Sequence, residues 1–539
     1  MALNKTRKVP LPEKGVVKHT NKKAKVTYIY YITRIYRNAK GKPTNDRVSI
    51  GKLDESTGLL IPNRNYYEIY LNEKTPENSK IETIKSFGLT FLIDGLLDSL
   101  GLTDLLRKKF PKTADKIIAM AQYMLCEGNV MSHFPEWCDE VYPHANVSLT
   151  SQEISRIFKE IDYDSRMEFF KTWIYAKEPD EYISYDVTSI SSYSKGIESL
   201  EWGYNRDGDT LPQINYAMYY GQNSLLPLYY SVYPGSIPDK SHLEYMLRDN
   251  KIIGCKKVRY VMDRGFFSAD NLQRVTESGN RFIIAVPNSN NFTKELIDKY
   301  RNQIIGRSEC RLGKDLPYAK SVIRNDFGMR VNAHIYYSSA KATAEENNLF
   351  EEIEKCEKAL SEMDEAPAKN LRYDRYFKIN RGKNGGFGFI RDNKKIDACL
   401  SRLGFFVIIE TIFTETSLKI LETYRERDVI EKSFDNLKND LDMKRIHCHS
   451  NETVEGKMFV AFFALILRSI MRNRLKDYQN EKNLTFSTVL KELNKIKYVK
   501  TTDGNMILSP VSKKQREILA ACGFDIDNLK DWFYHFCIV

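Results

Sequence analysis

The stretch Tyr424-Arg-Glu-Arg-Asp-Val-Ile-Glu-Lys-Ser-Phe-Asp-Asn-Leu-Lys438 decides how the rest of the chain is interpreted. In a helix each residue turns by about 100°, so Arg427, Glu431 and Lys438 lie at roughly 300°, 340° and 320° from Tyr424. The four residues would then share a stripe about 60° wide on one face. The acid can hold a metal ion, the cations can neutralise phosphate, and the phenol ring can stack on a base. This combination suits a phosphodiester.

The stripe alone does not indicate a functional site, because charged runs on helices are commonly solvent-exposed faces. A metal site would need further carboxylates from elsewhere in the chain. Asp186 lies within a predicted strand at 182–190, where a buried charge is costly unless it is paired or bound to a metal ion. Asp263 ends a predicted strand at 257–263, and ligands of open α/β sheets bind at such strand ends. Adjacent parallel strands would bring the two carboxylates together, and Glu431 could close the site from the helix.

Three clustered carboxylates repel one another unless cations hold them. Because no paired His or Cys accompanies Asp186, Asp263 and Glu431, their oxygen ligands favour Mg²⁺ or Mn²⁺ over zinc. Two such ions, about 4 Å apart, would activate an attacking oxygen and stabilise the leaving one in an in-line displacement. The sequence therefore favours a site for two divalent metal ions.

The strand and helix pattern around these residues indicates an α/β fold. Three predicted strands joined by short links are followed by strands that alternate with helices, which is the order of an RNase H-like mixed sheet. These strands are predicted at 182–190, 213–220, 226–233, 257–263, 281–286 and 404–410. The catalytic helix is expected from about 417 to 440. Residues 288–403 interrupt this order with strand-like pieces and a charged helical segment at 345–364, and we interpret them as an insertion.

The other regions have patterns of their own. An alternating run at 26–36, a turn at 38–45 and a second run at 47–53 predict an N-terminal β-hairpin. Helical periodicity follows, and Thr150 with Glu153 predicts a capping box at the start of one helix. We predict six segments: a basic arm and β-hairpin region at 1–80, a helical domain at 81–178, the first part of the core at 179–287, the insertion at 288–403, the second part of the core with the catalytic helix at 404–475, and a C-terminal helical unit at 476–539.

Composition sets wider limits. With 539 residues the chain is too long for one ordinary core, and its formal net charge of +11 is compatible with a nucleic-acid partner but also with many other enzymes. The polar N-terminus predicts no secretion signal, and the apolar run at 458–467 is too short to span a bilayer. The nine scattered cysteines indicate free thiols in a reducing cytoplasm. Nothing near His447-Cys448-His449 completes a zinc site.

Three blocks together resemble a known family. The segments Asp186-Val-Thr and Asp263-Arg-Gly-Phe, with the pattern Y-x2-R-x3-E-x6-K from Tyr424 to Lys438, are similar to the successive catalytic blocks of bacterial insertion-sequence transposases. The resemblance is to the fourth insertion-sequence family and its long-chain relatives. The stretches Leu211-Pro-Gln-Ile-Asn and Tyr233-Pro-Gly-Ser also look like that family's middle section. The similarity covers roughly residues 180 to 470.

This resemblance implies an Asp-Asp-Glu triad on an RNase H-like fold, with a β-rich insertion before the helix that carries the Glu. It makes Asp186, Asp263 and Glu431 the catalytic and metal-binding residues, and it makes Tyr424, Arg427 and Lys438 the residues that grip DNA ends. The implied reaction is cleavage at the inverted repeats of an insertion sequence, followed by strand transfer into target DNA. The implied setting is the bacterial cytoplasm and nucleoid, with double-stranded DNA and a homodimer in the DNA complex. The helical domain is expected to bind DNA, although it has no helix-turn-helix pattern.

Two other interpretations stay open. A divalent-metal nuclease of the same fold would cut without strand transfer, but it would not need Tyr424, Arg427 and Lys438. A captured transposase could remain as a catalytically silent DNA-binding protein. The presence of all three carboxylates argues against that second interpretation.

Overall fold

The structure is a computed structural model that describes residues 8–21, 26–38, 40–72, 80–175, 181–255, 257–368, 371–381, 387–502 and 505–538. Parts of the predicted basic arm, 1–7 and 22–25, lie outside the described residues, and so does the predicted boundary at 178/179. The chain forms two units. One contains Met1–Ile84 with Tyr498–Ser509, and the other contains Lys85–Lys497 with Pro510–Val539.

The first unit contains an antiparallel sheet. Its strands are, in sheet order, β1 (Val16–Asn21), β2 (Val26–Arg37), β3 (Pro43–Leu53) and β4 (Leu60–Pro62). The predicted hairpin corresponds to β2 and β3 and is confirmed. Alternation along the strands buries Ile29 and Ile50 on one face, where they pack with Leu60 and Tyr66.

A second sheet joins distant parts of the sequence. Strand β5 (Ile81–Ser86) is the neighbour of β16 (Lys497–Thr501), which also pairs with β17 (Met506–Leu508). The C-terminal segment at 476–539, predicted as a helical unit, thus also contains two short strands. The pairing partner of β16 lies about four hundred residues earlier in the chain, so no local pattern indicates it. The remaining C-terminal elements are helices: α16 (Phe486–Leu493), α17 (Lys513–Ala521) and α18 (Ile526–Ile538).

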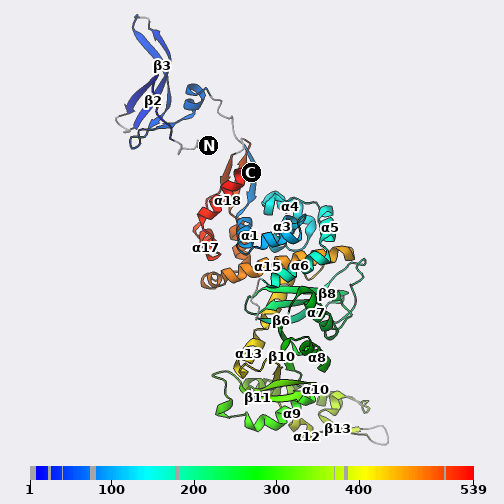
Figure 1. The fold of residues 1–539 in the computed structure, drawn as a ribbon. Coiled ribbons are helices and arrows are strands. Elements are labelled where there is room, and N and C mark those ends of the chain that lie inside the picture. Colours follow the sequence, from blue (N-terminus) through cyan, green and yellow to red (C-terminus); the bar gives the residue numbers. More distant parts are fainter. Residues whose placement is uncertain are drawn as a thin grey trace. The chain divides into compact units, whose positions relative to one another are not determined.

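The second unit is built on an eight-stranded mixed sheet with the order β11-β12-β15-β10-β9-β6-β7-β8 (Figure 1). The strands are β6 (Tyr182–Ser191), β7 (Gln213–Gly221), β8 (Pro227–Pro234), β9 (Arg259–Met262), β10 (Arg281–Val286), β11 (Tyr318–Asp326), β12 (Met329–Tyr337) and β15 (Phe405–Glu410). Strands β6, β9 and β10 are parallel neighbours, while β7 and β8 continue from β6 as an antiparallel meander. Helix α7 (Asp239–Ile253) leads from β8 to β9, and α8 (Ala269–Glu277) connects β9 to β10. The predicted mixed α/β sheet is confirmed.

The segment at 288–403 contains both strands and helices, and the helical segment predicted at 345–364 corresponds to α10 (Ser339–Ser361). Strands β11 and β12 extend the main sheet through β15. The other elements, besides α10, are α9 (Asn291–Tyr300), α11 (Leu371–Asp374), β13 (Phe377–Arg381), β14 (Phe387–Arg391) and α12 (Asn393–Leu400). Residues from α10, α12 and β13 pack into a small core of their own around Ile353 and Tyr376. Helix and strand therefore share this segment.

Helices precede the sheet in the sequence. They are α1 (Gly88–Ser99), α2 (Leu102–Lys109), α3 (Ala114–Glu127), α4 (Phe134–Glu140), α5 (Ser151–Glu160) and α6 (Tyr163–Tyr175). The capping box predicted at Thr150 and Glu153 is present at the start of α5. The long helix α15 (Asn451–Lys482) contacts α3, α5 and β8, so it joins these helices to the sheet (Figure 1). Among the described helices, none is both long and apolar enough to cross a membrane.

A buried histidine among these helices predicts a dependence of stability on pH. His144 Nδ1 lies 2.7 Å from Asp94 Oδ1, and His144 Nε2 lies 3.2 Å from Asp115 Oδ1. Burial opposes the charge, but hydrogen bonds to both carboxylates raise the pKa of His144 above its ordinary value. A raised pKa means that the stabilisation is complete below the unfolded-state pKa and is lost as the pH rises through the folded-state pKa. We therefore expect His144→Gln to destabilise the protein more at pH 6 than at pH 9, as measured by urea unfolding. An equal loss at both values would contradict a charged His144.

Candidate active site

The two predicted aspartates lie side by side on neighbouring parallel strands. In the register of β6 and β9, Tyr185 is opposite Met262, so Asp186 and Asp263 each follow by one residue at the same level. β-branched and aromatic residues keep β6 in the sheet interior, and Asp186 is only partly buried within an otherwise buried strand. Asp263 comes directly after β9, where its carboxylate accepts a hydrogen bond from the N–H of Gly265 (3.3 Å) and caps a short 3₁₀ turn. The adjacency expected from sequence is thus observed.

The third carboxylate comes from a helical segment that has a break in it. Helix α13 (Ser417–Arg425) ends just before α14 (Asp428–Asp435), which carries Glu431. Between them the N–H groups of Arg427, Val429 and Ile430 bond to carbonyls three residues back, so this turn is tighter than an α-helix. A π-helical turn, Asn436–Asp440, follows α14. The single continuous helix predicted from 417 to 440 is therefore divided into three parts.

All three carboxylates line one cavity of about 580 Å³. Its lining carries four acids and four cations among the described residues: Asp186, Asp239, Asp263, Glu431, Arg206, Arg264, Lys341 and Arg427. Neither His nor Cys contributes to this lining. The cavity therefore combines oxygen ligands suited to hard divalent cations with cationic groups suited to phosphate.

Asp186 is the most desolvated of the three acids. Its pKa is raised to about 6, mainly by burial and to a smaller extent by Asp263, against the lowering effects of the Val187 N–H (2.8 Å), Arg206 and Arg427. Among the residues that the structure describes, no cation lies within ion-pair distance of Asp186. A cation beside this carboxylate would therefore relieve an unfavourable desolvation.

Arg427 connects the other two acids. Its guanidinium lies 2.7 Å from Asp263 Oδ1 and 3.0 Å from Glu431 Oε1. The guanidinium is mostly buried, and its Nε has no hydrogen-bond partner among the described residues. In this arrangement, no group of three or more His, Cys, Asp or Glu side chains in the described part of the chain is placed to hold a metal ion. The positive charge beside Asp263 and Glu431 is supplied by Arg427.

Tyr424 forms part of the same wall. The Arg427 guanidinium carbon lies 5.4 Å from the centre of the Tyr424 ring, in a cation–π contact. Burial raises the pKa of Tyr424 to about 12, while Arg427 lowers it and Asp263 raises it. The phenol therefore remains protonated at neutral pH and can donate a hydrogen bond into the cavity.

Lys438 is placed differently from the rest of the predicted stripe. Tyr424, Arg427 and Glu431 line the cavity, but Lys438 does not. Its side chain is buried, and its Nζ donates to Asp207 Oδ2 at 2.6 Å. The stripe calculated for an ideal helix fails at this residue because the tight turn and the π-helical turn change the rotation per residue. Contact between Lys438 and DNA stays a prediction.

Several residues of the cavity were not found from the sequence. Arg206 lies in the connection between β6 and β7 and forms an ion pair with Asp239 at the start of α7. Lys341 comes from the first turn of α10, within the segment predicted as an insertion. A basic residue in the glycine-containing stretch Asn205-Arg-Asp-Gly208 could have indicated Arg206, whereas no local pattern marks Lys341.

Comparison with known proteins gives a family for most of this unit. Residues 177–467 match the family model described as "Transposase DDE domain". This match includes β6 to β15, all three carboxylates and the start of α15, and it spans more than half of the chain. No curated protein matches the chain in sequence.

Among solved structures, the piggyBac transposase synaptic complex with hairpin DNA has 10% sequence identity to this chain and a TM-score of 0.33. The match covers 75% of this chain and 76% of that one. A TM-score this low carries no argument about the site, so the assignment rests on the sequence match alone. The strand order β8-β7-β6-β9-β10 around Asp186 and Asp263 is the RNase H-like core that the sequence match implies. By this match over residues 177–467, the chain belongs to the DDE transposase family.

Proposed function

We propose that this protein is a cut-and-paste DNA transposase of the fourth insertion-sequence family, in its long-chain group. It cleaves DNA at the terminal inverted repeats of its own element and joins the freed ends to target DNA. The observation that carries this proposal is the meeting of Asp186, Asp263 and Glu431 at one cavity inside the matched domain. The pattern from Tyr424 to Lys438 supports the narrower family assignment.

In this proposal the three carboxylates are the catalytic and metal-binding residues. The donor set fits Mg²⁺ or Mn²⁺, because it offers carboxylate oxygens without His or Cys among the described lining and includes the desolvated Asp186. Two such ions, when bound, supply activation of the attacking oxygen and stabilisation of the leaving oxygen. The protein itself fixes Asp186 and Asp263 on rigid neighbouring strands and brings Glu431 from α14. Arg427 holds Asp263 and Glu431 on the same side of the cavity.

Tyr424 and Arg427 are proposed to grip the DNA end. Arg427 and Tyr424 both line the cavity, where the guanidinium and the phenol hydroxyl can donate to phosphate oxygens. Lys438 is proposed to assist from farther away: its ion pair with Asp207 fixes the β6–β7 connection that presents Arg206 to the cavity. The reaction requires double-stranded DNA, and two ends would be held by a homodimer in the bacterial nucleoid.

A cleavage assay tests this function. The purified protein is incubated with Mg²⁺ and a duplex that carries the inverted repeats flanking its gene, and a duplex with shuffled repeats serves as the control. We expect metal-dependent cutting at the repeat ends and transfer of the freed 3′ ends into a target plasmid. Cutting without preference for the repeats would indicate a nuclease instead. Binding of the repeats without any cutting would indicate a silent DNA-binding protein.

A further inference from the structure

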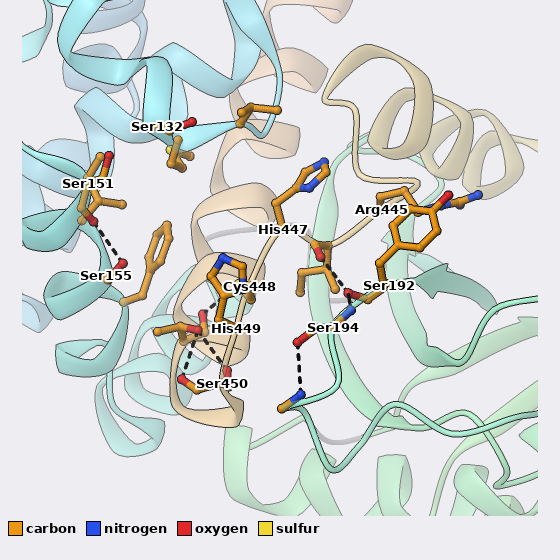
Figure 2. A pocket seen from close by; sticks show the side chains of 18 of the residues that line it. Ser132, Ser151, Ser155, Ser192, Ser194, Arg445, His447, Cys448, His449 and Ser450 are labelled. Atoms are coloured by element: carbon orange, nitrogen blue, oxygen red, sulfur yellow. Dashed lines mark hydrogen bonds between the residues drawn. The ribbon is translucent and has the colours of Figure 1, made fainter.

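A second cavity lies apart from the one that holds the three carboxylates. It has a volume of about 830 Å³ and is lined by parts of four segments: the loop before α4, helix α5, the residues after β6, and the segment from Arg445 into the start of α15. In Figure 2, Ser151 and Ser155 of α5 face Ser192 and Ser194 across the pocket, with His447 and His449 between them. The catalytic proposal gives this cavity no role.

The polar side chains of the lining are almost all basic or hydroxyl-bearing. Among the described residues that form it, none is acidic, whereas five carry basic side chains: Lys159, Lys195, Arg445, His447 and His449. Hydroxyl groups supply most of the remaining polar surface: Ser132, Ser151, Ser155, Ser192, Tyr193, Ser194, Ser450 and Thr453. Cationic and hydroxyl donors without carboxylates form the usual lining of a phosphate site.

Part of the basic lining is available to a ligand. Lys195, His447 and His449 are exposed, and no described side chain forms an ion pair with them. Lys159 and Arg445 pair with acids that lie outside the lining, Glu452 and Asp209. The pocket therefore attracts anions, although two of its cations are partly neutralised.

A buried lysine adds charge behind the wall. Lys457 Nζ donates to the carbonyl oxygen and to Oδ1 of Asn129 (both 2.8 Å) and to the carbonyl oxygen of His447 (3.1 Å). Burial lowers the pKa of His447, and Lys457, Arg445 and His449 lower it as well, while Asp442 raises it, so His447 is a neutral hydrogen-bonding group at neutral pH. The positive charge of the lining at neutral pH therefore comes from Lys159, Lys195 and Arg445, with Lys457 behind the wall.

The dimensions suit a nucleic-acid strand. Ser151 and Lys159 are eight residues apart on α5, which places about 12 Å of groove along that helix. This length spans about three nucleotide steps of one DNA strand at 3.4 Å each. Ser192 follows Asp186 by six residues along β6, or about 20 Å of extended chain. About six nucleotide steps of a DNA strand have the same length.

We propose that this pocket binds the phosphate backbone of the DNA substrate about 20 Å from the catalytic carboxylates. This inference rests on the proposed function for the identity of the ligand, and it adds a second anchoring site to it. The contacts go to phosphate and therefore carry little sequence information. They hold the substrate in register while the catalytic cavity acts on the end.

Binding measured against salt concentration tests the pocket. The pair Lys159→Gln with Lys195→Gln removes two charges from the lining. The control pair, Lys355→Gln with Lys358→Gln, removes the same charge from exposed positions on α10, outside the pocket. Affinity for the inverted-repeat duplex is measured without metal, so that no cutting occurs. We expect the pocket pair to weaken binding about tenfold or more and to reduce the slope of log K against log salt by about 1.8, with little change in the control.

The outcomes separate this proposal from the proposed function. If both pairs lost affinity for the duplex equally, the effect would come from the net charge of the protein. The pocket proposal would then be wrong. If neither pair changed the affinity while the wild type bound and cut the repeats, the pocket proposal would be wrong. The proposed transposase function would still be supported. A wild type that bound no DNA would overturn both.

Protection of Lys195 from chemical acetylation gives a second readout that needs no variant. DNA is expected to slow acetylation of Lys195 but not of Lys358. Protection by inorganic phosphate without protection by DNA would mean that the pocket binds small phosphate compounds only, which overturns the proposal.

Discussion

Replacing Glu431 by glutamine is expected to lower the rate of DNA cleavage by about a thousandfold or more, equal to about 4 kcal/mol of activation free energy. Glutamine keeps the size of the side chain but removes the negative charge needed to hold a divalent cation. The side chain is more than half exposed, and its ion pair with Arg427 spans four residues of helix. Such pairs contribute only about 0.3–0.5 kcal/mol to stability, so the variant should fold and bind the repeats normally.

A neighbouring glutamate supplies the matched control. Glu426 is exposed, lies one turn earlier on the same helical segment, and does not line the catalytic cavity. Glu426→Gln removes the same charge and should leave cleavage within about threefold of wild type, because surface changes away from a site have small effects. Cleavage rates and repeat binding are measured for both variants. If Glu431→Gln retained cleavage within about tenfold, or lost binding as severely as cleavage, a catalytic role for Glu431 would be refuted.

The central pair of the site was predictable from sequence for a simple physical reason. Asp186 and Asp263 are each placed by the strand that contains or precedes them, and parallel neighbours align such residues in register. A charge inside an apolar strand and a charge just after one are both local signals. The proximity of Glu431 could be anticipated as well, because α14 follows strand β15 of the same sheet after a short helix.

The position of Lys438 could not be obtained in the same way. The prediction assumed an ideal rotation of about 100° per residue over fourteen residues. Each local irregularity adds an error to the predicted angular position of Lys438. The tight turn at Arg427 and the π-helical turn around Lys438 both change that rotation. Such departures depend on the packing of the whole segment, so the sequence of the helix does not show them.

Contacts made through tertiary structure were also missed. Arg206 and Lys341 reach the cavity from a connection and from the start of α10, which share no pattern in the chain. The pairing of β12 with β15 brings together strands separated by most of α10, α12 and the β13–β14 hairpin. Strand pairing of this kind is set by which surfaces become buried together, and local propensity carries little information about it.

The start of α15 offers the largest expected effect on stability. Three consecutive residues of this helix hold three different segments: Glu455 forms an ion pair with Arg166 of α6, Gly456 packs on Phe158 of α5, and Lys457 bonds to Asn129. A Cβ atom at Gly456 would lie 2.6 Å from both the carbonyl carbon and the Cα of Phe158, and it would lie closer still to the carbonyl oxygen. These are backbone atoms, so no side-chain rotation can make room.

We therefore expect Gly456→Ala to destabilise the protein by about 2–4 kcal/mol, because α5 and α15 must move apart in a densely packed interior. Alanine favours the helix over glycine by about 1 kcal/mol, so a neutral or higher unfolding midpoint would show that the two helices do not pack this closely. Gly388→Ala is the control, since no atom lies within 4 Å of a Cβ added there. Urea unfolding of both variants measures the difference. Because α5 and the start of α15 also line the large basic pocket, any folded Gly456→Ala protein should bind the inverted-repeat duplex more weakly than the Gly388→Ala control does.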